Sequence, residues 1–221
     1  MLSFKRMTEN LQAKRAEKAG LKDLERIFGE SLERLRQIFA SGPSQLIDQP
    51  VPPYPGGRFL GEIGINAYSQ THHVEAEQFP TFLNIVRHER RPVGRFSYQR
   101  EVNGCPLSTI LSLESRFGGR VVRMLSNDVE LMSNIAAGQF NPPPPWIAWY
   151  ELGPILHVSQ GDAHYWLNYI WDPYWGSLSL DAQDAYLAHK RLETIAYISD
   201  EDWGDWVDSI RRRDRRTRET A

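Results

Sequence analysis

The apolar residues of the first forty positions recur at steps of three and four, and Lys, Arg and Glu fill the positions between them. The apolar positions are Leu21, Leu24, Phe28, Leu32, Leu35 and Phe39. This spacing predicts an amphipathic helical arm over residues 1–41, which Ser41-Gly42-Pro43 ends. The pattern lasts under three clean heptads, so packing of the arm onto its own chain is favoured over a coiled-coil seam.

A Pro/Gly-rich stretch, GPSQLIDQPVPPYPGG, follows at residues 42–57 and predicts a connector between the arm and a globular body. The body spans residues 58–213, and a basic tail closes the chain at 214–221. We find no internal repeat.

Helical spacing dominates the body. It occurs in three segments: residues 72–91, with a start near Pro80, residues 107–117 and residues 121–137. Arg95 to Val102 alternates instead and precedes an Asn103-Gly104 turn signal, which predicts a strand. Residues 59–68 fit a strand or a short helix. The sequence therefore predicts a mainly α fold with a possible small β element.

Four prolines follow Asn141 and predict a rigid polyproline II segment. Beyond them we expect three helices: Asp162 to about Trp171, a second with Ser179 as its N-cap, and Asp200 to about Arg213. The third has acids at its start and arginines at its end, which complements the helix dipole.

The charges are unevenly distributed although the formal net charge is only −2. Residues 124–210 carry 13 acidic and 2 basic residues, whereas residues 211–221 carry 6 basic and 2 acidic ones. An acidic surface repels nucleic acid, so no nucleic-acid partner is expected. The same surface suits a basic protein partner, because complementary charge speeds association.

The composition excludes several further classes of protein and of binding site. One cysteine excludes an internal disulfide and a zinc site built from cysteines. No apolar run predicts a signal peptide or a membrane helix, so we expect a cytoplasmic protein without a membrane partner. Phosphate-binding glycine loops, HExxH and GxSxG are absent, and no cofactor or metal is expected.

The histidines leave an enzymatic alternative open. His157, Asp162 and His164 could form a facial metal set or an acid–base group, with Ser159 as a possible nucleophile. The favoured interpretation is a helix start in which Asp162 caps and His164 is partly buried. His72-His73, near Glu75 and Glu77, fits a polar helix start better than a metal site.

All seven tryptophans lie between residues 146 and 206. Aromatic residues at helical spacing are more often core than binding surface, but tryptophan is also enriched in protein–protein hot spots. We therefore expect part core and part exposed aromatic–acidic surface. The candidate partner-binding residues are Asp162, Asp172, Asp200, Glu201, Asp202, Trp203, Asp205 and Trp206.

The order of PPPPW (142–146), GDAHYW (161–166), LSL (178–180) and YLAHK (186–190) resembles the Pro/Trp-rich C-terminal region of immunity-type proteins. Those proteins are found beside bacterial polymorphic toxins and type VI secretion effectors. The resemblance covers roughly residues 141–200 and implies a cytoplasmic, non-enzymatic protein that binds and neutralises a cognate toxin.

The leading hypothesis is thus an immunity or antitoxin-like protein that occludes a basic toxin stoichiometrically. An enzyme with a Trp-lined pocket that uses His157, Asp162 and His164 is the first alternative. The second is a structural or adaptor protein of a secretion or phage assembly, with the N-terminal helix as an oligomerisation seam. The sequence leaves the oligomeric state open.

Overall fold

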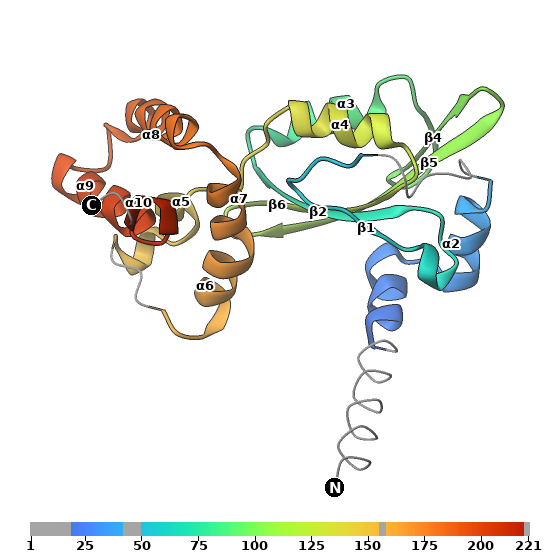
Figure 1. Ribbon diagram of the computed structural model, residues 1–221, viewed down its shortest axis with the longest axis horizontal. Helices are drawn as coiled ribbons and strands as arrows, with labels where there is room; N and C mark the ends of the chain where they lie inside the picture. Colours follow the sequence, from blue (N-terminus) through green and yellow to red (C-terminus); the bar gives the residue numbers. More distant parts are fainter. Residues whose placement is uncertain (1–18, 42–49, 155–157, 219–221) are drawn as a thin grey trace, which may run out of the picture.

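The computed structural model describes residues 19–41, 50–154 and 158–218. Figure 1 shows two parts side by side: a β-sheet with helices on both faces, and a group of helices at one end of the sheet. We call these the sheet part and the helical part.

The sheet part contains one six-stranded sheet in the order β1-β2-β6-β5-β4-β3, in which all neighbouring strands are antiparallel. The strands are β1 (Arg58–Phe59), β2 (Tyr68–Glu75), β3 (Arg91–Gly94), β4 (Ser97–Val102), β5 (Cys105–Arg116) and β6 (Gly119–Ser126). The short helix η2 (Gly61–Ile63) links β1 to β2. Strands β3 to β6 follow one another as hairpins, and β6 returns beside β2.

The expectation of a mainly helical fold is wrong, because the protein has a mixed α/β fold. The segments 107–117 and 121–126, read as helical, are instead most of β5 and β6. Their alternation is hidden because both faces of the sheet are covered there: residues 107–111 are all buried. Strands buried on both sides read as continuous apolar runs rather than alternating ones.

Other local signals were read correctly. The predicted strand before Asn103-Gly104 is β4, and both turn residues have positive φ, 52° and 75°. Such a turn matches the twist of a hairpin. Helix α3 (Phe79–Arg87) begins beside Pro80 as expected, although residues 72–75 before it belong to β2.

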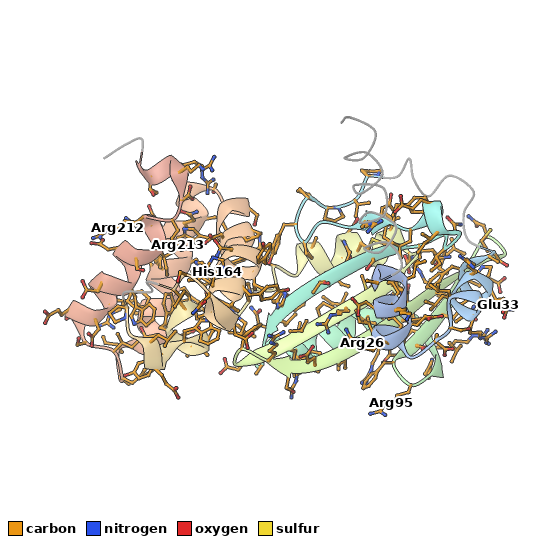
Figure 2. The ribbon with its side chains drawn as sticks, turned by 90° about the horizontal axis from the view of Figure 1, so that it is seen from below. Arg26, Glu33, Arg95, His164, Arg212 and Arg213 are labelled. Atoms are coloured by element: carbon orange, nitrogen blue, oxygen red, sulfur yellow. The ribbon has the colours of Figure 1, made fainter. Side chains whose placement is uncertain are left out.

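Helices α3 and α4 (Val129–Ala137) cover one face of the sheet (Figure 1). Their apolar side chains, including Phe82 and Leu131, pack with Val122 and Met124. The N-terminal arm covers one end of the opposite face, where Figure 2 shows its helix with the labelled Arg26.

The described part of the arm is two helices rather than one. Residues 19–28 are helical, Gly29 takes a φ of +68°, and Ser31 caps α2 (Leu32–Phe39) by accepting a hydrogen bond from Arg34 N. Leu35 and Phe39 are fully buried against Ile110 and Leu125. The amphipathic face therefore packs onto its own chain.

The helical part begins at the last residue of the proline run. It contains α5 (Pro145–Ala148), η3 (Tyr150–Leu152), α6 (Gly161–Trp166), η4 (Leu167–Trp171), α7 (Asp172–Ser177), α8 (Leu180–Thr194), α9 (Asp200–Arg211) and α10 (Arg215–Arg218). The segments α6, η4 and α7 run on as one helix with a π-helical middle. Five buried tryptophans fill its core: Trp146, Trp166, Trp171, Trp175 and Trp206.

The proline run and the connector join the two parts. Residues 142–145 are buried, and Pro143 packs against Gly119 at the start of β6. From the described end of the connector, Pro55 O accepts a 3.1 Å hydrogen bond from Gln70 Nε2 of β2. The Tyr54 ring lies 5.7 Å from that of Tyr174 on α7.

Candidate functional site

Several acids of the predicted binding surface have an arginine partner. Asp162 accepts from Arg116 Nη2 at 2.8 Å. Asp172 accepts from Arg213 Nε and Nη2 at 2.8 and 2.7 Å, a bidentate pair. Arg213 also reaches Asn168 Oδ1, and Asn168 donates to the carbonyl of His164, so the turn after α9 lies beside the helix that carries His164 (Figure 2).

The basic residues at the end of the chain are engaged by the same helical part. Arg211 pairs with Asp184 at 2.6 Å, and Arg216 pairs with Asp214 while donating to the carbonyl of Leu178. The acidic surplus counted along the sequence is therefore reduced locally. Exposed ion pairs contribute little stability, but they do cancel charge that a partner would otherwise meet.

The first two turns of α9 keep free acids. Ser199 caps the helix through the N–H of Asp202, and Asp200 pairs with Arg191. Within the described residues, no ion pair involves Glu201 or Asp205, and both are exposed. These two carboxylates are available to a basic partner.

The tryptophans belong mainly to the core. Trp206 is 2% exposed, so its ring cannot anchor a partner on the surface. Trp203 is half-buried, with its ring 4.8 Å from that of Trp146 and beneath the guanidinium of Arg191. Of the two predicted anchors, only Trp203 retains an accessible edge.

An apolar surface that the sequence reading missed lies at the end of α8. Leu192 is 74% exposed, Ile195 66% and Tyr197 49%. Leu192 lies opposite the buried stripe of α8, which includes Leu187 and Lys190. Its position on the helix could therefore have predicted its exposure from the sequence. We call residues 192–205 the α8–α9 surface, since the exposed apolar side chains and the free acids follow one another there.

Of the residues of the enzymatic alternative, the structure describes Asp162 and His164. His157 lies outside the described residues, Asp162 is bound to Arg116, and His164 is half-buried. In residues 19–41, 50–154 and 158–218, no group of three His, Cys, Asp or Glu could hold a metal ion.

His72 and His73 do not begin a helix. They lie on β2, where His72 is buried against the ring of Phe82 and His73 points to the other face. Burial, then the charge of His73, lowers the pKa of His72 to about 3. Burial, then Arg123 and Arg116, lowers that of His73 to about 4. Both imidazoles are neutral near neutral pH.

No family model matches this chain, and the searches of curated proteins and of solved structures likewise find no match. Across the described part of the chain, every helix is too short or too polar to cross a membrane.

Proposed function

We propose that this chain is a cytoplasmic, non-enzymatic binding protein of the immunity or antitoxin type. It binds a basic protein partner through the α8–α9 surface and occludes the partner's active site stoichiometrically. The observation that carries the proposal is that exposed Ile195 and Tyr197 are followed along the chain by the exposed carboxylates of Glu201 and Asp205, which no ion pair of the described residues engages.

The composition of this surface suits protein recognition. Productive interfaces combine a desolvated apolar centre with a polar rim. Leu192, Ile195 and Tyr197 supply the apolar centre, and the acids of α9 supply the rim. The half-buried Trp203 adds an aromatic edge that is already held in place by Trp146.

The acidic residues of this surface favour a partner of opposite, positive charge. The acids at the start of α9 steer a basic partner during encounter and exclude acidic proteins. Because this attraction is screened by salt, the complex forms faster at low ionic strength than at high ionic strength. The apolar contacts then keep the complex together.

The alternatives have less support. The engagement of Asp162 by Arg116 works against an acid–base group with His164. In residues 19–41, the described part of the N-terminal arm, Leu35 and Phe39 are buried against the sheet, which works against an oligomerisation seam built from these side chains.

The test is a pull-down with the tagged chain from its native cell lysate at low and high salt. A basic protein captured at low salt should be lost with Glu201→Lys/Asp205→Lys and with Ile195→Ser. Matched controls are Glu101→Lys and Val93→Ser, which change exposed residues of the sheet part. Equal capture by all four variants, or no basic protein in either buffer, would overturn the proposal.

A second step tests neutralisation. The captured protein should lose its activity when it is mixed with one equivalent of this chain. The Ile195→Ser variant should leave that activity intact. A partner that stays active in the complex would contradict occlusion while leaving binding in place.

A further inference from the structure

A cavity of about 640 Å³ lies where the sheet part meets the helical part. Its walls come from the connector, β2, the end of α4, and helices α7 and α8. The lining includes Tyr54, His72, Phe140, Asn141, Tyr174 and Tyr186. The volume is in the range that holds small-molecule ligands.

No charged side chain lines this cavity among the described residues. The lining consists of prolines, aromatic rings, small aliphatic groups and neutral polar groups. Burial raises the pKa of Tyr54, Tyr174 and Tyr186, so their hydroxyls stay protonated. A charged ligand would therefore lose its hydration here without gaining a counter-ion.

The outer edge of β2 adds a backbone pair. Ala67 O and Ser69 face β1, and Glu75 N donates to Asn141 O on the same side. Since this orientation alternates along a strand, the N–H and C=O of His73 face that edge too. No described residue bonds them, and His73 lines the cavity.

We propose that this cavity binds an uncharged, flat ring compound that carries a hydrogen-bond donor and an acceptor side by side, as an aromatic carboxamide does. The amide pairs with the backbone N–H and C=O of His73. The rings of Tyr54, Phe140, Tyr174 and Tyr186 enclose the flat part.

Three probes of nearly equal shape test the charge requirement: benzamide is neutral, benzoate is an anion and benzamidine is a cation. Each is titrated into the full-length chain by ligand-observed NMR. Saturable binding is expected for benzamide, at least about tenfold tighter than for either ion. Equal binding of the three probes, or no saturable binding of benzamide, would overturn the proposal.

Ala185→Phe assigns the binding to this cavity, because it adds a bulky ring to the lining. It should weaken benzamide binding about fivefold or more, whereas Ala188→Phe, at an exposed position of α8 outside the lining, should not. Unaltered affinity in Ala185→Phe would refute the assignment. Capture of a protein partner is measured separately, so the failure of one proposal does not decide the other.

Discussion

Lys190 Nζ on α8 donates a 2.9 Å hydrogen bond to Glu75 Oε2 at the end of β2, across 115 positions of sequence. Both side chains are nearly buried, and Glu193 provides a second carboxylate at 2.9 Å. Burial disfavours the charged lysine, but the two carboxylates outweigh it and raise the pKa of Lys190. Lys190 divides its hydrogen bonds between Glu75 and Glu193, and its attraction does not outweigh burial, which raises the pKa of Glu75. This pair joins the helical part to the sheet.

Removing the lysine should therefore be costly. Lys190→Met leaves the Glu75 carboxylate buried without its counter-charge, and we expect a loss of about 3 kcal/mol in the free energy of unfolding. Urea denaturation measures it. The double variant Glu75→Gln/Lys190→Met should recover much of the loss, because no isolated charge remains. Equal stability of the single and double variants would mean that the pair is not coupled.

Stability should fall as the pH drops below about 6, because His72 and His73 resist protonation in the fold. Their pKa values lie near 3 and 4, below the ordinary value of 6.5, so the unfolded chain binds protons first. Stability from a lowered pKa is complete above the unfolded value and declines below it, by up to about 1.4 kcal/mol per histidine and pH unit.

Urea denaturation at pH 7, 6 and 5 checks this slope. His73→Gln cannot be protonated and should flatten the slope, although not abolish it. The raised pKa of Glu75 acts in the opposite sense just above its ordinary value of 4.5, so the decline should be clearest between pH 6.5 and 5. A pH-independent free energy of unfolding over that window would contradict the buried, neutral histidines.

Local signals in the sequence predicted local structure well. Ser179 caps α8 by accepting from Ala182 N, α9 begins at Asp200, and Asn103-Gly104 forms the β4–β5 turn. Each of these depends on residues within a few positions of one another. The strands β5 and β6 were missed because burial on both faces removed the period-two pattern on which strand prediction depends.

The candidate sites depend on contacts between residues far apart in the sequence, which no local sequence pattern predicts. The charge count gave an acidic half, yet it could not show that Arg213 would neutralise Asp172 or that Arg116 would reach Asp162. The edge of β2 is open beyond Ser69 because β1 pairs with only two of its residues, and His72 is buried because its ring packs on Phe82. Tertiary contact, rather than residue type, decides which of these groups remain available.

Asp128 should be the most sensitive carboxylate of the sheet part. It is 1% exposed, accepts from Arg90 and Arg100 at 2.6 to 2.7 Å, and caps α4 through Leu131 N. Burial alone raises its pKa, but these hydrogen bonds outweigh burial and lower it. Asp128→Asn keeps the shape of the side chain but removes the negative charge that pairs with Arg90 and Arg100, two largely buried arginines.

We expect Asp128→Asn to lower the free energy of unfolding by about 3 kcal/mol or more. The control is Glu130→Gln, which removes an exposed carboxylate that also meets Arg100, and which should cost under about 1 kcal/mol. Thermal and urea unfolding of the two variants give the comparison. A similar small loss for both would show that the buried position of Asp128 confers no special role.

The contact between the proline run and the sheet can be tested at one glycine. A Cβ on Gly119 would lie 2.5 Å from Pro143 Cγ and 2.6 Å from Val74 O. Val74 O belongs to the neighbouring strand, so it cannot retreat without disturbing the β2–β6 pairing. Gly119→Ala should therefore lower the free energy of unfolding by about 2 kcal/mol or more, through overpacking.

Gly204→Ala is the matched control, since it makes the same chemical change inside α9 where nothing lies within 4 Å. Alanine has the higher helix propensity, so this variant should gain up to about 1 kcal/mol. Opposite signs for the two substitutions in urea denaturation are the expected result. A stabilising Gly119→Ala would mean that the proline run does not pack on β6, and the placement of the helical part beside the sheet would then have to be revised.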